Sequence, residues 1–540
     1  MRQQPLRQVI SATLLAGTLA LGNVHAAELD LATATIADLE TAMNRGKLTS
    51  AKLVSLYMKR IEAYDKKGPN INAVILLNPN ALAEAKALDR ERKTKGPRSP
   101  LHGIPIVLKD NYNTFDMPTT AGSQLLAGSV PPADAFVVAK LRAAGAIILA
   151  KTNLSEFAGC CSAPGIAAVP NGFSSAGGQT RNPHDLTKGP SGASGGSGAA
   201  IAAAFAQFGL GTDTGGSIRG PSSANGIAGL KPTRGLLSRA GIVPLALSFD
   251  TGGPMARNVS DIAAALGAMT GVDPADSATA ASAGHSSTDY TQYLKVGSLK
   301  GARIGVARDF FKQNAETDRV MERSIAQLKA LGATVVDPVN YPDYVLQARQ
   351  PLLTLVVNSE FKTQIAEYLA TLRPGYPRTL AELVAKASDP ATGYRSPEKR
   401  DGMRNTDAIA LDANDPLFIT ARDKGLALVR ENVLDLFGKY QLDALVYPTS
   451  PRPPTPITPP PVGTPPLGGS ATGIANITGF PDLIVPAGMT DDGLPVTISF
   501  FGPAWSEPKL LGYGYDFEQA TKARVLPKFT PALPSDVFKN

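Results

Sequence analysis

The apolar positions of this chain gather in short runs separated by stretches with helical spacing. Runs of four or five apolar residues are typical of strands buried in a sheet. They lie at residues 73–77, 104–108, 146–150, 304–307 and 444–447. Between them, residues 135–144 and 318–331 have the three- and four-residue periodicity of helices. Strands that alternate with helices predict an α/β fold.

Longer stretches differ in composition. Thr49 and Ser50 can cap a helix that has Leu53, Leu56, Tyr57 and Ile61 on one face. An alanine-rich helix is predicted at 198–207, within a Gly-, Ser- and Thr-rich segment at 172–235. Residues 340–440 have a mainly helical pattern, whereas the prolines of 451–466 exclude a regular helix there. Strand-like runs flank each irregular stretch, so we expect residues 27–540 to form a single domain.

The N-terminus has the pattern of a secretory signal. Arg2 and Arg7 precede an apolar run at 9–21, and Val24 and Ala26 suit a cleavage site before Ala27. A membrane anchor or a buried helix is the alternative, but the run is short for a membrane span. We therefore expect residues 1–26 to be a signal peptide, and the mature chain to be periplasmic or secreted without stable membrane association.

Charge and cysteine content narrow the function classes. Without Arg2 and Arg7 the formal charge of +7 becomes about +5, from 51 basic and 46 acidic side chains. No long basic run accompanies this mild excess, so a nucleic-acid partner is not expected. Cys160 and Cys161 are the only cysteines and are adjacent. Adjacent cysteines bridge only with strain, so we expect two packed thiols.

The sequence contains no motif that is typical of a metal or cofactor site. The histidines are His25, His102, His184 and His285, and none of them forms a close pair of the kind that binds zinc. No Gly-Lys-Ser/Thr closes a phosphate-binding loop, and residues 209–215 miss the dinucleotide spacing. The sequence therefore predicts neither a metal nor a cofactor.

One hydrolase motif is present, because residues 192–196 match G-x-S-x-G with Ser194 in the centre. In α/β-hydrolases this motif is the nucleophile elbow and follows an apolar strand directly. Here residues 181–191 are polar and contain two prolines, and the only later histidine is His285. An esterase of this type that uses Ser194 is the weaker alternative.

A second constellation supplies the parts that amide cleavage needs. Lys109 ends the apolar run 104–108, where burial would lower its pKa by the roughly three units that a neutral base near pH 7 requires. Ser217 follows two glycines and can act as a nucleophile. The backbone N–H groups of residues 214–217 can form an oxyanion hole. Its four residues are Thr214, Gly215, Gly216 and Ser217.

Several motifs in order resemble the amidase signature family. They are LHGIPIVLKDN (101–111), AKTNLSE (150–156), the glycine-serine segment (191–196), GTDTGGSIR (211–219), GLKPT (229–233), SRAGIVP (238–244), DTGGPMAR (250–257) and TGFP (478–481). The resemblance implies a large mixed central β-sheet covered by helices on both faces. It also implies a helical, substrate-side insert around 340–440. Within the family, stand-alone bacterial amidases, including peptide amidases, are most similar.

The resemblance also implies a mechanism. A small-molecule or peptide amide is hydrolysed, without a cofactor, by a Ser-cisSer-Lys triad that forms an acyl-enzyme. Lys109 and Ser217 match the outer members of this triad, and Asp213 and Arg219 match residues that brace the nucleophile loop, although a plain ion pair is also open to them.

The bridging serine of the triad falls on Ala193, which cannot relay a proton. The three explanations are a knockout at Ala193, a shifted loop in which Ser194 takes the role, and a water molecule in place of the hydroxyl; we favour the knockout. A catalytically silent protein that binds amides is the alternative from another functional class.

Overall fold

The computed structural model describes residues 28–458 and 471–539. The predicted signal peptide at 1–26 therefore lies outside the described residues, as does part of the proline-rich stretch. Within the described ranges, no helix combines the length and apolar character needed to cross a membrane.

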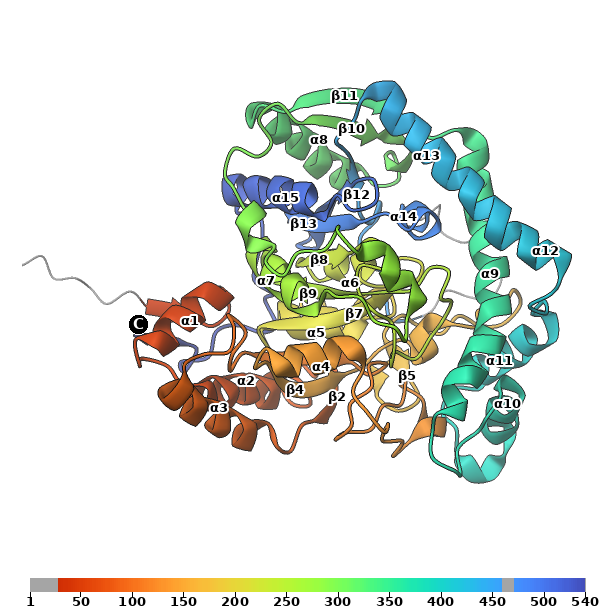
Figure 1. The fold of residues 1–540 in the computed structure, drawn as a ribbon, viewed down its shortest axis with the longest axis horizontal. Coiled ribbons are helices and arrows are strands. Elements are labelled where there is room, and N and C mark those ends of the chain that lie inside the picture. The colour runs from red at the N-terminus through yellow and green to blue at the C-terminus, as the bar shows by residue number, and fades with distance from the viewer. Residues whose placement is uncertain (1–27, 459–470, 540) are drawn as a thin grey trace, which may run out of the picture.

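An eleven-stranded mixed sheet forms the centre of the molecule (Figure 1). Strands β3, β4 and β7 are parallel neighbours, whereas β9 pairs antiparallel with β7 and β8. In spatial order the strands are β11 (Thr334–Val339), β10 (Arg303–Ala307), β12 (Ala444–Pro448), β14 (Pro495–Phe501), β13 (Asp482–Met489), β8 (Ala228–Lys231), β9 (Thr251–Ala256), β7 (Phe208–Asp213), β3 (Pro105–Lys109), β4 (Ile147–Thr152) and β2 (Val74–Leu77). All of them belong to one sheet, while the division into domains stays a prediction.

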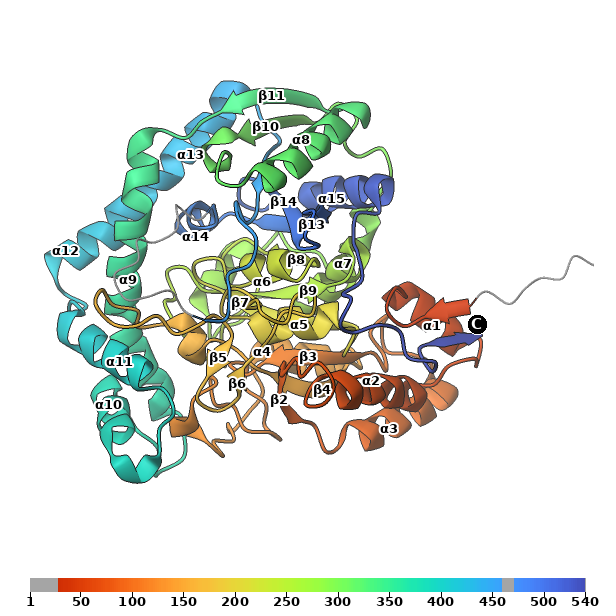
Figure 2. The same cartoon turned by 180° about the vertical axis from the view of Figure 1, so that it is seen from behind.

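Helices flank this sheet. Helices α5 and α6 pack on each other, with α5 against β7 and α6 against β13. Helices α7 and α15 also pack on each other, with α7 against β9 and α15 against β13. The view from behind in Figure 2 shows α2 and α3 beside β3 and β4. The predicted fold class, a large mixed sheet with helices on both faces, is confirmed. These helices are α1 (Ile36–Asn44), α2 (Ser50–Tyr64), α3 (Ala81–Lys95), α4 (Phe136–Ala143), α5 (Gly195–Ala202), α6 (Arg219–Ala224), α7 (Val259–Met269), α8 (Ala315–Ala330), α14 (Gly473–Thr478) and α15 (Glu507–Thr521).

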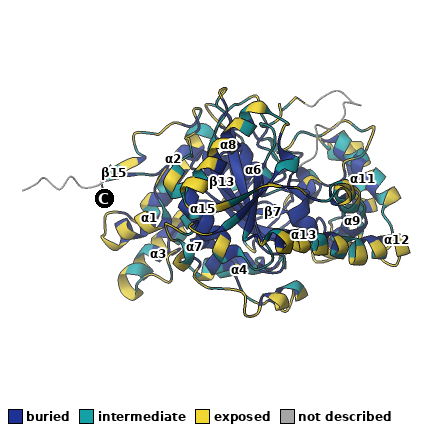
Figure 3. Ribbon diagram, turned by 90° about the horizontal axis from the view of Figure 1, so that it is seen from above, coloured by how far each residue is buried: buried dark blue, intermediate teal, exposed yellow. Residues whose placement is uncertain are grey.

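A separate group of helices fills residues 343–440, as the sequence pattern predicts. Its longest member, α9, runs for 28 residues beside the sheet. Figure 3 shows buried residues concentrated on the central strands β7 and β13 and more exposed ones on α12. The group comprises α9 (Asp343–Ala370), α10 (Leu380–Ser388), α11 (Pro397–Ile409), α12 (Pro416–Ile419) and α13 (Leu426–Tyr440).

Two small sheets complete the described part of the chain. The first pairs β1 (Glu28–Asp30) with β15 (Val537–Lys539), so the two ends of the described chain lie side by side. Arg60 of α2 forms a buried ion pair with Asp536 just before β15, and this contact fastens the C-terminal segment to the body. The second small sheet pairs β5 (Phe173–Ser174) with β6 (Gly178–Gln179).

The five apolar runs correspond to β2, β3, β4, β10 and β12, but the pattern misses the central strand β7. The reason is its glycines. A Cβ on Gly209 would lie 3.0 Å from the Val107 side chain, and one on Gly211 would lie 2.8 Å from Ser194 Oγ. Only small residues fit at these strand positions, because α5 and β3 approach closely. The glycines therefore interrupt the run of large apolar residues by which a buried strand is recognised in the sequence. The helix predicted at 198–207 starts earlier, at Gly195, and ends at Ala202.

Candidate active site

Lys109 is the last residue of β3, a strand that is buried along its whole length. Its ammonium Nζ donates a hydrogen bond of 2.6 Å to Thr212 Oγ1 on the neighbouring strand β7. Burial lowers the pKa of Lys109 from 10.5 to about 7, although the charges of Asp213 and Asp250 oppose the shift. A large share of this lysine is therefore neutral near pH 7, as the sequence predicts for a base.

Thr212 is the direct partner of this lysine. Its hydroxyl oxygen also accepts a hydrogen bond of 3.0 Å from the Asn111 side-chain amide. A hydroxyl can both accept and donate, so Thr212 can hand a proton to a neutral Lys109 as well as receive its hydrogen bond. Sequence reasoning missed this residue. Its place beside Lys109 comes from the parallel pairing of β3 with β7, which sets Leu108 opposite Leu210 and which no local sequence pattern shows.

The nucleophile loop follows β7 directly and ends where α6 begins. Asp213 holds the loop, because its carboxylate accepts the backbone N–H of Gly216 at 2.8 Å and that of Ile218 at 3.0 Å. Gly216 has φ +127°, and a Cβ there would lie 2.4 Å from Thr472 Oγ1, so only glycine fits. The loop is thus a tightly fixed turn that presents Ser217.

The predicted oxyanion donors differ in their availability. The N–H of Gly216 is already bonded to Asp213. Within the described residues, the N–H groups of Thr214, Gly215 and Ser217 have no hydrogen-bond acceptor. Gly215 is exposed and Ser217 is half-buried. Three of the four predicted donors are therefore free to bind an oxygen atom at this turn, and their role stays a prediction.

Arg219 links the loop to distant parts of the chain. This fully buried side chain pairs with Asp213 and with Asp482, each at 3.0 Å. It also donates to Asn476 Oδ1 at 2.6 Å. Burial alone would raise the pKa of Asp213, but the charge and hydrogen bonds of Arg219 hold it well below its usual range. Asp213 and Arg219 thus form an ion pair that also fixes the loop.

Ser194 lies at the start of α5 and is fully buried. Its hydroxyl donates to the Thr212 carbonyl at 3.1 Å and accepts the Thr212 N–H at 3.2 Å. Its own N–H donates to the Ser217 carbonyl at 3.2 Å. Ser194 therefore ties α5 to β7 and to the nucleophile loop, and both hydrogen-bonding functions of its hydroxyl are occupied.

Ala193 is buried and lines the same cavity as Ser217. A Cβ on the preceding Gly192 would lie 3.3 Å from Ser217 Cα, so this segment runs directly beside the nucleophile loop. Asp337–Pro338 is the one cis peptide in the described part of the chain, so the Gly192–Ala193 bond is trans. The position that the resemblance assigns to a serine in a cis peptide thus has neither the hydroxyl nor the cis bond.

Two cavities meet at Ser217. One, of about 400 Å³, includes Arg452 and is called the Arg452 cavity below. The other, of about 310 Å³, includes Cys160, Cys161 and Ala193 and is called the thiol cavity. Helix α9 contributes Leu353, Val357 and other residues to the thiol cavity. The helical group at 343–440 therefore reaches the site, although its role toward a substrate stays a prediction.

The comparisons with known proteins agree with this geometry. The Amidase family model matches residues 52–511. The chain belongs to the amidase signature family. A probable amidase of Arabidopsis thaliana, At4g34880, is 37% identical over 502 residues, which cover 92% of this chain and 91% of that protein. The A-type subunit of the glutamyl-tRNA(Gln) amidotransferase of Moorella thermoacetica is also 37% identical, over 90% of this chain and 96% of its own length.

Solved amidase structures share the fold closely. The native peptide amidase from Stenotrophomonas maltophilia superposes with a TM-score of 0.85 at 41% identity, covering 92% of this chain and 99% of its own. An amidase family protein from Bacillus anthracis gives a TM-score of 0.82 at 31% identity, covering 92% of this chain and 93% of its own. The predicted similarity to peptide amidase is confirmed.

The three described histidines of this amidase family member, His102, His184 and His285, take no part in the site. His102 and His184 are buried and each contacts a backbone carbonyl through Nε2. His285 is exposed and stacks on Trp505 at 4.9 Å. In the described chain no strand directly precedes Ser194, since β6 ends at Gln179. The esterase alternative built on Ser194 is therefore not favoured. Within the described ranges, no cluster of three or more His, Cys, Asp or Glu residues has the arrangement of a metal site.

Proposed function

We propose that this chain hydrolyses a linear carboxylic or peptide amide, with Ser217 as nucleophile and Lys109 as base. One observation carries the proposal: a fully buried lysine with a pKa of about 7 lies beside the strand that ends in the Ser217 loop. Membership of the amidase family supports amide cleavage in general. The amide subtype and the residue roles are the proposed part.

The reaction follows from these groups. Ser217 Oγ attacks the amide carbonyl carbon, and its proton passes to neutral Lys109. Backbone N–H groups at residues 214, 215 and 217 stabilise the negative oxygen. The C–N bond then breaks as the nitrogen takes a proton from Lys109, which releases ammonia or an amine. Water attacks the Ser217 ester, and its proton restores the serine hydroxyl by way of Lys109.

Ala193 weakens the proton path between these two residues. The side chain has no hydroxyl, and the neighbouring Ser194 hydroxyl is occupied by the backbone of β7. The Thr212 hydroxyl remains in contact with Lys109. We therefore propose a slow enzyme in which the relay runs through Thr212 or solvent, since general acid-base groups contribute roughly 10² to 10⁴ in rate.

A fluorophosphonate probe tests the nucleophile. The probe phosphonylates an activated serine with loss of fluoride, and intact-protein mass spectrometry with peptide mapping locates the adduct. We expect an adduct on Ser217 and no adduct in Ser217→Ala. An adduct on Ser194 would contradict the assignment. Amide binding without an adduct or turnover would identify the chain as a silent amide-binding protein.

Export is proposed separately, on the pattern of residues 1–26 alone. Expression in a Gram-negative host with fractionation, followed by N-terminal sequencing, tests it. We expect a mature protein that begins at Ala27 in the periplasmic fraction. A cytoplasmic protein that retains Arg2 and Arg7 would contradict the proposal.

A further inference from the structure

Ser217 lies between two cavities that differ in charge. Both share Asn171, Gly192, Gly215 and Ser217 as a common wall. The thiol cavity combines apolar side chains, such as Leu353 and Val357, with polar ones, such as Gln350, and its described lining contains no Lys, Arg, Asp or Glu. The Arg452 cavity is lined by prolines as well as by hydroxyl and amide side chains, and it contains one guanidinium. The scissile amide has a substituent on each side of its carbonyl, so each cavity can take one of them.

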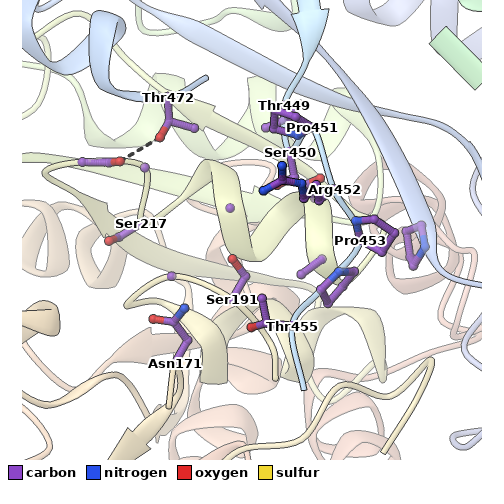
Figure 4. A pocket seen from close by; sticks show the side chains of 18 of the residues that line it. Asn171, Ser191, Ser217, Thr449, Ser450, Pro451, Arg452, Pro453, Thr455 and Thr472 are labelled. Atoms are coloured by element: carbon purple, nitrogen blue, oxygen red, sulfur yellow. Dashed lines mark hydrogen bonds between the residues drawn. The ribbon is translucent and has the colours of Figure 1, made fainter. Parts of the chain in front are cut away.

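Arg452 belongs to the segment that follows β12. Its side chain is half-buried and extends into the cavity that Ser217 borders from the other side (Figure 4). Of the described residues that line this cavity, none is Asp or Glu, and Arg452 is the sole ionisable side chain among them. The cavity therefore has a net positive charge beside the nucleophile.

The guanidinium has no counter-charge among the described residues. Arg452 forms no ion pair or hydrogen bond with any described residue, whereas Arg60, Arg219 and Arg239 each form an ion pair with an aspartate. Residues 1–27 and 459–470, which lie outside the description, contain no Asp or Glu in their sequence. No side-chain carboxylate in those two stretches can neutralise Arg452. A free guanidinium in a cavity is suited to a carboxylate, which it binds through two parallel hydrogen bonds.

We propose that Arg452 binds a carboxylate of the substrate, so that the preferred amides carry a free carboxylate close to the scissile carbonyl. This inference rests on the proposed function, because it places the anion relative to Ser217. The polar side chains of Gln313, Thr449 and Ser450 line the same cavity and can complete the hydrogen bonding. The opposite substituent lies in the thiol cavity, whose described lining has no Lys, Arg, Asp or Glu side chain.

Two pairs of amides test the preference and locate the carboxylate. Hippurate and N-propylbenzamide differ in a carboxylate on the amine side, whereas succinamate and butyramide differ on the acyl side. We expect one charged amide to exceed its neutral partner in kcat/KM, and Arg452→Gln to reduce that ratio by about 10- to 100-fold, as for loss of a hydrogen bond to a charged group. Arg452→Lys should restore part of it. Arg319→Gln, at an exposed position outside both cavities, is the matched control and should leave the ratio unchanged.

Calorimetric binding of the same amides separates this inference from the proposed function. Tighter binding of a charged amide that is lost in Arg452→Gln supports the anion site even if turnover is undetectable. Failure of Ser217 to react with the fluorophosphonate would defeat the proposed function alone. The anion site is overturned if neither charged amide binds more tightly than its neutral partner, or if Arg452→Gln changes the preference by less than twofold.

Discussion

The ends of β3 and β8 look alike by burial and charge, yet they differ in what their lysines touch. Lys109 and Lys231 each end a strand, each is fully buried, and burial lowers the pKa of each to about 7. Lys231 donates to the carbonyls of Pro232, at 3.0 Å, and Phe480, at 2.8 Å. Lys109 donates at 2.6 Å to the Thr212 hydroxyl.

The partner atom decides the chemistry. A backbone carbonyl only accepts, so Lys231 can anchor the chain but cannot receive a proton from its partners. A hydroxyl both accepts and donates, so Lys109 has a route for proton transfer. A neighbouring buried lysine, Lys151, is held by an ion pair of 3.0 Å with Asp110. A lowered pKa alone therefore does not identify the base, because structural lysines also show one.

Replacing each lysine by methionine gives the largest expected difference. Lys109→Met should lower the hydrolysis rate by about 10² to 10⁴, because the general base is lost. Lys231→Met should lower the hydrolysis rate by less than about tenfold, because that side chain only donates hydrogen bonds to two backbone carbonyls. Each of these hydrogen bonds contributes about 1 kcal/mol to stability. Ammonia release measures the rates, and circular dichroism confirms folding. Equal rate losses in the two variants would contradict the assignment of Lys109 as the base and Lys231 as a structural residue.

Adding a hydroxyl at residue 193, in the cavity that Ser217 lines, should produce the next largest effect. Ala193→Ser should raise the rate by about 10² or more, because it restores the relay position of the family. Ala193→Gly is the matched control, since it changes the same site without a hydroxyl. A gain of tenfold or less in the serine variant, measured by steady-state amide hydrolysis, would show that Ala193 does not limit the reaction.

The pH dependence should follow the neutral form of Lys109. With a pKa of about 7, the lysine is protonated and inactive as a base below that pH. We expect kcat/KM to fall about tenfold per pH unit below pH 7 and to level off above it, as for any single base of this pKa. Rates between pH 5 and 9 test this expectation. A profile without an inflection near 7 would remove Lys109 as the titrating base.

The same shift makes stability depend on pH. The folded pKa of about 7 lies below the unfolded value of 10.5, so the unfolded chain binds more protons between these values. The contribution of Lys109 to unfolding free energy therefore falls as pH drops from 10.5 to 7 and is constant below that. Lys109→Met should weaken this dependence in urea unfolding curves.

Thr212 should have the smallest effect. Thr212→Val keeps the shape but removes the hydroxyl that contacts Lys109, and we expect a rate loss of about tenfold, comparable to one hydrogen bond to a charged group. Thr212→Ser should retain the rate and the pH profile. If the valine variant matches the original rate and inflection, the relay runs through solvent alone.

Lys109 and Ser217 could be chosen as candidate site residues from the sequence, because they lie in ordered local motifs, and their roles stay a prediction. Lys109 ends a clear apolar run, and Ser217 follows two glycines. Thr212 and Arg452 were not predicted. Thr212 matters only through the pairing of β7 with β3, and the glycines of β7 hide that strand. Arg452 follows β12 in a proline-rich stretch whose only local signal is the absence of regular structure.

Contacts between segments far apart in the sequence also explain why the Ser194 hydroxyl is buried. Its G-x-S-x-G motif suggests an exposed hydroxyl, whereas the structure buries it against Thr212. A local pattern cannot show which strand will pass beside a helix start. Six strands of the sheet were missed for related reasons, since several contain glycine or proline at points of close approach.

The Arg219 contacts also bear on how the protein matures. The turn that presents Ser217 is held by Asp213, yet its arginine partner is held in turn by Asp482 and Asn476, far along the chain. During synthesis, those two partners emerge long after the serine. The nascent chain therefore cannot assemble a working turn until nearly all of it is available, so hydrolytic capacity and complete folding should be acquired in the same late step.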